Sequence, residues 1–190
     1  GSLPQYIVPT DFSNTAKEAI KYALKMNKKN PGIITLIHVI HPTLKDAQEG
    51  IQNISELEAL NLKKLENYKK ELIEDFCIDS NYVVINYEIL SGFAGETIRN
   101  YAEKIKNSVI IMGTTGNERA SKKLFGSVSL EVALKSKLPV FLVPPDLNPG
   151  KIQKVSYLIS DCSKDLESLR KFSQMEYKTL KEIHLLLIND

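Results

Sequence analysis

The sequence predicts an α/β fold in which helices cover both faces of an open parallel sheet. Short apolar runs of strand length alternate with segments whose apolar residues recur every three or four positions, as in amphipathic helices. The run at 33–40 is apolar at nearly every position, which is typical of a strand covered on both faces. Alternating strands and helices imply right-handed crossovers and therefore parallel strands. The chain of 190 residues, 43% hydrophobic and 25% charged, is long enough for one globular domain and a remainder.

The first strand is expected at residues 6–8, and a helix follows it. In this helix Thr15 and Glu18 have the spacing of a capping box, and Asn-Pro-Gly at 30–32 ends it. Its apolar face is formed by Ala16, Ala19, Ile20, Ala23 and Leu24. The later elements alternate in the same way, with strands expected at 33–40, 82–90, 109–112 and 140–143 and helices at 54–76, 98–105 and 127–135.

The end of the chain repeats its beginning. With an offset of 150 positions, the Thr-Asp-Phe-Ser sequence at 10–13 falls on Ser-Asp-Cys-Ser at 160–163, and with an offset of 149 the apolar run at 34–40 falls on 183–189. We therefore expect four parts: a lead-in at 1–4 that resembles the remnant of an expression tag, a domain at 5–145, a linker at 146–150 and an incomplete β-α-β second repeat at 151–190.

The most specific motif lies between the fourth strand and the fourth helix. Gly113, Gly116 and Gly126 followed by Ser127 form the pattern G-x2-G-x9-G-S. Glycines let backbone N–H groups approach an anion closely, and the amides at a helix N-terminus attract negative charge, so this loop suits phosphate binding. The hydroxyl groups of Ser127 and Ser129 would add donors. The alternative is a simple turn, which would be favoured if Gly113 and Gly116 stood alone.

Other candidate site residues have weaker support. Asp11 is equally well explained as an N-cap or Asx-turn residue of the first helix and as a ligand contact. Packing is favoured over metal binding for the histidines, none of which has a histidine four residues away: His38, His41 and His184. A solvated loop is favoured over phosphate contact for the basic residues Arg119, Lys122 and Lys123. The sequence shows no catalytic set of residues and no metal-ligand cluster.

Composition argues against several classes of partner. The formal net charge is +2, which is too small to indicate a nucleic-acid or membrane-surface binder. No apolar run approaches the roughly 20 residues of a membrane-spanning helix. The two cysteines, Cys77 and Cys162, lie far apart in the sequence, so we do not expect a disulfide framework. We expect a reducing, cytoplasmic location.

The motifs resemble those of the universal stress protein family. The resemblance rests on Val-Pro-Thr-Asp-Phe-Ser at 8–13, Ile-His-Val-Ile at 37–40 and the glycine pattern at 112–129. It covers residues 5–145, and the glycine pattern is similar to that of the ATP-binding branch of the family. The partial repeat is similar to the tandem form of the family, truncated early in its second repeat.

The resemblance implies a five-stranded parallel sheet of order 3-2-1-4-5, a Rossmann-like fold of the adenine nucleotide alpha hydrolase type. The first and fourth strands are then neighbours, and their carboxyl ends form the crevice in which open α/β sheets bind ligands. Many family members have a histidine where this chain has Thr115, which leaves side-chain details open. By position, the resemblance implies that the nucleotide binds at Pro9, Thr10, Asp11, Val39, Met112, Gly113, Gly116, Gly126, Ser127, Val128 and Ser129.

The resemblance therefore implies a stress or regulatory protein that binds ATP, ADP or AMP, with or without Mg2+. Little or no hydrolysis is expected, because phosphoryl transfer needs a positioned nucleophile and metal ligands and the motifs indicate neither. Two alternatives stay open: an enzyme that uses adenine nucleotide, as a slow ATPase or in adenylyl transfer, and a dimerisation module that binds no nucleotide. The expected partners are a second copy of the chain, paired through the fifth strand, and an unidentified client protein.

Overall fold

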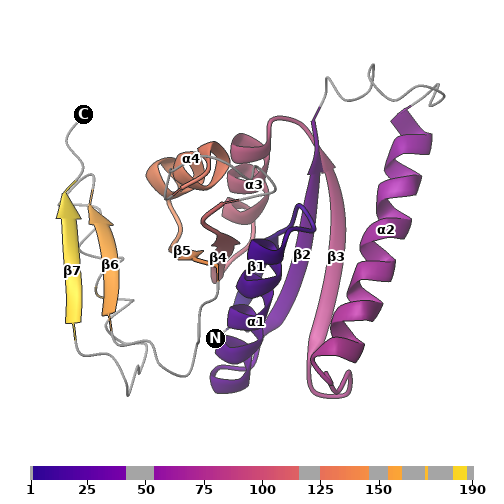
Figure 1. The fold of residues 1–190 in the computed structure, drawn as a ribbon, viewed down its shortest axis with the longest axis horizontal. Coiled ribbons are helices and arrows are strands. Elements are labelled where there is room, and N and C mark those ends of the chain that lie inside the picture. Colours follow the sequence, from indigo (N-terminus) through magenta and orange to yellow (C-terminus); the bar gives the residue numbers. More distant parts are fainter. Residues whose placement is uncertain are drawn as a thin grey trace. The chain divides into compact units, whose positions relative to one another are not determined.

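The structure is a computed structural model that describes residues 2–41, 54–115, 125–145, 154–159, 170 and 182–187. The chain divides into two compact units, Gly1–Asp146 and Leu147–Asp190. The described part of the first unit holds a five-stranded parallel sheet with four helices, and that of the second holds a pair of strands (Figure 1).

The sheet of the first unit has the strand order β3-β2-β1-β4-β5, and all of its neighbouring strands are parallel. The α/β fold and the strand order expected for the family are therefore confirmed. This order places β1 and β4 side by side, with Gln5 of one opposite Ser108 of the other. The strands are β1 (Gln5–Pro9), β2 (Ile33–Ile40), β3 (Val84–Ser91), β4 (Ser108–Gly113) and β5 (Val140–Val143).

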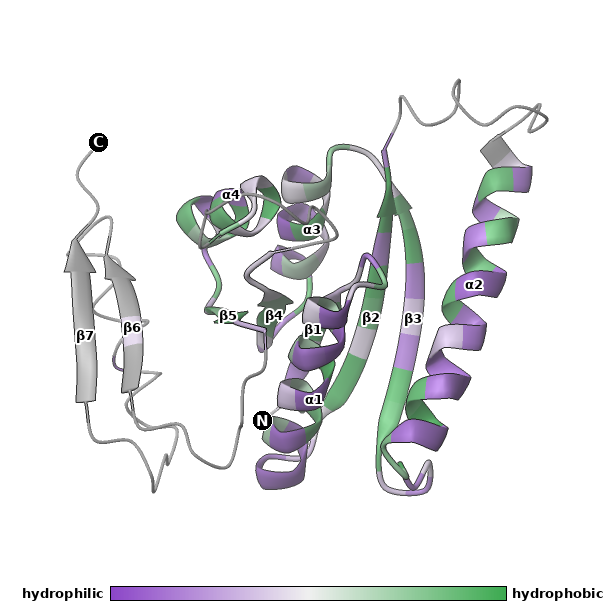
Figure 2. Ribbon diagram, viewed as in Figure 1, coloured by the Kyte–Doolittle hydropathy of each residue, from purple (hydrophilic) through white to green (hydrophobic). Residues whose placement is uncertain are grey.

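Four helices are described in the first unit: α1 (Asn14–Lys29), α2 (Ile54–Asp75), α3 (Ala94–Glu103) and α4 (Ser127–Lys135). The chain runs from β1 to β3 and then crosses to β4 and β5, so right-handed connections place α1 and α2 on one face and α3 and α4 on the other. Hydrophobic and hydrophilic residues alternate along α1 and α2, as expected for helices with one buried side (Figure 2). Helix α3 begins before the expected start at residue 98, because its first turn has no large apolar residue and so does not extend the apolar periodicity.

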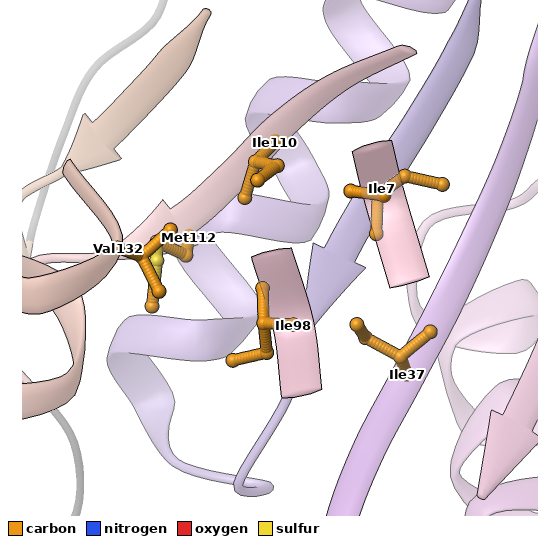
Figure 3. Packing of buried hydrophobic residues seen from close by; sticks show 7 residues of the cluster. Ile7, Ile37, Ile98, Ile110, Met112 and Val132 are labelled. Atoms are coloured by element: carbon orange, nitrogen blue, oxygen red, sulfur yellow. The ribbon is translucent and has the colours of Figure 1, made fainter. Parts of the chain in front are cut away.

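A hydrophobic cluster lies between the sheet and the two helices α3 and α4 (Figure 3). Ile7, Ile37 and Ile110 come from three adjacent strands, and Ile98 and Val132 come from α3 and α4. All five side chains are buried. Because successive side chains of a strand point to opposite faces, the next residues along the strands are directed to the α1 and α2 face. The buried residues of these strands on that face include Tyr6, Val8, Leu36 and Ile111.

The start of α1 differs from the expectation. The N-cap residue is Ser13, whose hydroxyl oxygen accepts a hydrogen bond from the amide of Ala16 at 3.1 Å. The prediction of a capping box at Thr15 and Glu18 was wrong, because Asn14 and Thr15 already belong to the helix. Thr15 is buried in the first turn of α1.

The second unit contains β6 (Lys154–Ile159) and β7 (Glu182–Leu187), which are parallel. Lys154 pairs with Glu182, and in the first unit Gln5 pairs with Ile33. The partner lies 28 positions further along the chain in both cases, and each residue of the second pair follows its counterpart by 149 positions. The two pairs of strands therefore have the same register.

Candidate functional site

A cavity of about 450 Å3 opens at the carboxyl ends of β1, β2 and β4. The chain leaves β1 and β4 in opposite directions across the sheet, and ligands of open α/β sheets bind at such a switch point. The volume is in the range of small-molecule sites. The cavity is lined by Pro9, Thr10, Asp11, Ala16, Ile37, His38, Val39, Ala94, Ile98, Met112, Gly113, Thr115, Gly126, Ser127, Val128 and Ser129.

The turn after β1 forms one wall of the cavity. The amide of Thr10 donates a hydrogen bond to the carbonyl oxygen of Ile37 at 2.8 Å, so Thr10 continues the pairing of β1 with β2 beyond the strand. The Oδ1 atom of Asp11 accepts a hydrogen bond from the amide of Ser13 at 3.0 Å. This is an Asx-turn, and the helix cap itself is Ser13. Asp11 is half-buried beside the cavity.

His38 lies beside this turn. Its Nδ1–H group donates a hydrogen bond to the carbonyl oxygen of Thr10 at 2.8 Å, which leaves Nε2 as the unprotonated nitrogen of the neutral ring. Burial lowers the pKa of His38 below its ordinary value of 6.5; the hydrogen bond to Thr10 and the charge of Asp11 oppose this shift, and the charge of Lys64 adds to it. His38 is therefore neutral at physiological pH.

The part of the cavity between β2 and α3 is apolar. Ile37 and Val39 of β2 face Ala94 and Ile98 of α3 across the cavity lining, and Met112 of β4 completes this region. Ile37, Ile98 and Met112 also belong to the hydrophobic cluster of the domain or pack with it, so the lining is fixed by the core. An apolar slot of this kind suits a flat ring system such as a nucleobase.

Gly113 lies where β4 passes closely under α1. A Cβ atom at this position would lie 2.8 Å from Cγ2 and 3.0 Å from the carbonyl carbon of Thr15. Gly92 is the glycine with a positive φ in the described part of the chain, so Gly113 is not required by a left-handed backbone. Glycine at 113 is explained by the close approach of a helix.

Gly126 begins α4 and has more room. A Cβ atom there would make contacts of 3.6 Å and longer, all of ordinary van der Waals length. Its amide donates a hydrogen bond to the carbonyl oxygen of Thr114 at 2.7 Å and is therefore engaged within the chain. The hydroxyl of Ser129 lies 2.6 Å from the same carbonyl oxygen and 3.0 Å from that of Gly126, so its hydrogen is engaged as well.

The N-terminus of α4 therefore presents backbone amides to the cavity. Gly126 is the N-cap residue, and within the described residues no side chain caps the helix. Ser127, Val128 and Ser129 occupy its first turn, where amides have no partner within the helix. These amides and the positive end of the helix dipole favour a negatively charged group in this part of the cavity.

Comparison with known proteins agrees with this arrangement. The model of the universal stress protein family matches residues 6–144, which is most of the chain. The chain belongs to the universal stress protein family. Universal stress protein MJ0531 from Methanocaldococcus jannaschii is 31% identical over 140 residues, which are 72% of this chain and 79% of that protein.

Solved structures of universal stress proteins share the fold. That of MJ0577 from Methanocaldococcus jannaschii is 26% identical with a TM-score of 0.63, and the match covers 78% of this chain and 100% of that one. Another is a universal stress protein in complex with cAMP, which is 16% identical with a TM-score of 0.54 over 77% of this chain and 100% of that one. At this identity the second match concerns the fold alone.

The cavity brings together the site residues expected from the universal stress protein motifs. Ten of the eleven line it, and the other, Gly116, lies outside the described residues. The basic residues Arg119, Lys122 and Lys123 also lie outside them. Sequence reasoning missed six lining residues: Ala16, Ile37, His38, Ala94, Ile98 and Thr115. Ala16, Ile37 and Ile98 were predicted on the apolar face of a helix or within a strand, and only the fold shows that they also line the cavity. Ala94 lies outside every expected element.

Among the residues that the structure describes, no group of three or more histidine, cysteine, aspartate or glutamate side chains is placed to hold a metal ion. The helices described here include none that is both long enough and apolar enough to cross a membrane.

Proposed function

We propose that this universal stress protein binds an adenine nucleotide in the cavity. The observation that carries the proposal is that one cavity joins an apolar slot, at Val39 and Ile98, to the amides at the start of α4. A nucleotide has the same two chemistries, a flat base and an anionic phosphate chain. The complex of a universal stress protein with cAMP is an example of this fold with an adenine nucleotide.

Each lining residue has a role in this proposal. Pro9, Thr10 and Asp11 border the adenosine, and the backbone of Val39 meets the edge of the base. Met112 and Gly113 form the floor. The phosphates lie against the start of α4 and the preceding loop, where their contacts are Gly116, Gly126, Ser127, Val128 and Ser129. Because the Gly126 amide and the Ser129 hydroxyl are engaged within the chain, the donors are the backbone amides of 127–129.

We propose a regulatory rather than a catalytic role. The carboxylate among the lining residues belongs to Asp11, and its Oδ1 atom already accepts the Ser13 amide. His38 donates its ring hydrogen to Thr10 and so serves to hold the turn. We therefore expect turnover of ATP with Mg2+ far below the roughly 1 per second of ordinary enzymes. The enzyme alternative predicts turnover that Asp11→Ala abolishes while ATP binding persists.

The deciding experiment identifies the ligand directly. Small molecules released from purified, denatured protein are analysed by mass spectrometry, and ligand-free protein is titrated calorimetrically with ATP, ADP and AMP. At about 100 times its dissociation constant, a nucleotide stabilises the fold by roughly 2.7 kcal/mol. Absence of both binding heat and thermal shift with all three nucleotides would overturn the proposal and favour the dimerisation module.

We also propose that the second unit is an incomplete copy of the first, in a tandem arrangement of domains. The shared register of β1 with β2 and of β6 with β7 supports it. The boundaries in this proposal are a domain at 5–145, a linker at 146–150 and the partial repeat at 151–190. We propose in addition that the protein forms a homodimer through β5. We also propose that it acts on a client protein in the cytoplasm.

A further inference from the structure

We propose that Phe12 is a positioning residue for this cavity, holding the Thr10–Asp11 turn in place from the side of α2. The inference rests on the proposed function, because the turn is taken to contact the nucleotide. Phe12 itself is not among the residues that line the cavity. It acts through the residues that precede it in the sequence.

The first observation is the backbone of Phe12. Its φ of 64° lies in the left-handed region, which glycine adopts readily and which is unfavourable for a bulky residue such as phenylalanine. Such a conformation persists only where the surrounding structure holds it. Contacts with neighbouring residues must therefore hold the backbone of Phe12 in this conformation.

The second observation is the set of side chains around the Phe12 ring. The ring centroid lies 4.8 Å from that of His38 and 5.2 Å from that of Tyr68, the latter in an edge-to-face arrangement. The Nζ atom of Lys64 lies 4.1 Å from the centroid, within the range of cation–π contact. Lys64 and Tyr68 both belong to α2, so this helix anchors the ring.

The third observation connects the ring to the cavity. The amide of Phe12 donates a hydrogen bond to Oγ1 of Thr10 at 3.0 Å, and the next amide, that of Ser13, donates to Oδ1 of Asp11 at 3.0 Å. His38, which packs on the ring, holds the carbonyl oxygen of Thr10 at 2.8 Å. The orientation of Thr10 and Asp11 therefore depends on a backbone that the ring of Phe12 keeps in place.

The buried Tyr68 hydroxyl belongs to the same region. Burial raises the pKa of Tyr68 to about 12; the polar interaction with the Thr10 side chain opposes this shift, and the charge of Asp11 adds to it. Tyr68 therefore reaches from α2 to the underside of the turn. The position of α2 is in this way coupled to the cavity through Phe12.

The test compares ATP affinity in matched variants by calorimetry. Phe12→Leu removes the ring, and Phe12→Gly removes it while allowing the same φ. We expect both to bind ATP about tenfold more weakly, the size expected when aromatic contacts that fix a site are lost. Phe76→Leu is the control, because Phe76 is a half-buried ring beside Lys17 and Lys21 outside the cavity lining; its affinity should be that of the wild type.

Coupling to Asp11 separates positioning from a general structural effect. In an Asp11→Ala background, Phe12→Leu should change ATP affinity by less than about twofold, because the group that it positions is absent. Tyr68→Leu leaves the turn sequence intact and should weaken ATP binding by about threefold. It serves as the second variant if Phe12→Leu fails to fold.

Two results would overturn the inference while leaving the proposed function intact: wild-type affinity in Phe12→Leu, or an equal loss with and without Asp11. A wild type that binds no adenine nucleotide would instead overturn the proposed function. Hydrogen exchange of the Ser13 amide in nucleotide-free protein then tests the role of the ring by itself. Faster exchange in Phe12→Leu than in Phe76→Leu supports it, and equal exchange overturns it.

Discussion

Gly126 lies where the cavity meets α4, and its surroundings leave space for a larger side chain. Its φ of −73° and ψ of 159° are accessible to valine. We therefore expect Gly126→Val to fold, with a loss of about 1 kcal/mol or less from the changed N-cap. ATP binding should weaken by about ten- to a hundredfold, because the branched side chain separates the phosphates from charge-assisted hydrogen bonds. Calorimetry and urea unfolding measure the two effects separately.

Gly113 should behave in the opposite way. A methyl group at this position meets the side chain and backbone of Thr15, so α1 and β4 must move apart. We expect Gly113→Ala to lower the free energy of unfolding by about 1–3 kcal/mol, the usual cost of overpacking. Urea unfolding of the nucleotide-free protein measures it. A variant as stable as the wild type would show that α1 and β4 can accommodate the added methyl group without lowering the free energy of unfolding.

The lowered pKa of His38 predicts that the stability of the fold depends on pH. Its pKa is lowered in the folded state, so the unfolded chain binds more protons once the pH falls below 6.5. The contribution of His38 to stability is therefore complete above this pH and is lost as the pH decreases toward the folded pKa. The free energy of unfolding of His38→Gln should decrease less between pH 7 and pH 5 than that of the wild type. Parallel curves for the two proteins would contradict the prediction.

At the scale of an element, the N-cap residue of α1 is Ser13 and not Thr15. Ser13→Ala removes the acceptor for the Ala16 amide and should cost about 1 kcal/mol of stability. Ser13→Gly is the matched control, since glycine at an N-cap costs only a few tenths of a kcal/mol relative to serine. Chemical unfolding of both variants provides the comparison. Equal stability of the two would show that the cap contributes little.

At the scale of the whole molecule, β5 is an edge of the five-stranded sheet, and exposed edges recruit other strands. The carbonyl groups of Pro139 and Val143 accept hydrogen bonds from the amides of Ile110 and Thr114, so the amides of Val140 and Leu142 point away from the sheet. We expect a homodimer that dissociates on dilution and that Leu142→Pro weakens by removing one outward amide.

Light scattering over a dilution series of wild type, Leu142→Pro and Leu142→Ala tests this assembly. The alanine variant controls for loss of the side chain, which packs against the hydrophobic cluster, because it keeps the amide. Dimerisation should be weaker with proline than with alanine. A wild type that stays monomeric at high micromolar concentration would rule out the dimer.

Sequence alone determined the fold class and the number of strands in the first unit, and it singled out the glycine motif beside the cavity. Apolar periodicity carries this information, because a buried strand and an amphipathic helix need different spacings of apolar residues. The strand order and the position-by-position assignments came from the resemblance to the universal stress protein family. The start of α3 was missed because its first turn has no large apolar residue that would extend the periodicity.

The tertiary structure decided which role each residue has. Gly113 and Gly126 belong to one sequence motif and both line the cavity. Only the tertiary structure shows that α1 packs too closely on Gly113 for a side chain, whereas Gly126 has space for one. His38 and Phe12 were assigned no role at the site from local sequence. Their importance depends on α2, which lies far from them in sequence, and contacts between distant segments leave no local periodicity to detect.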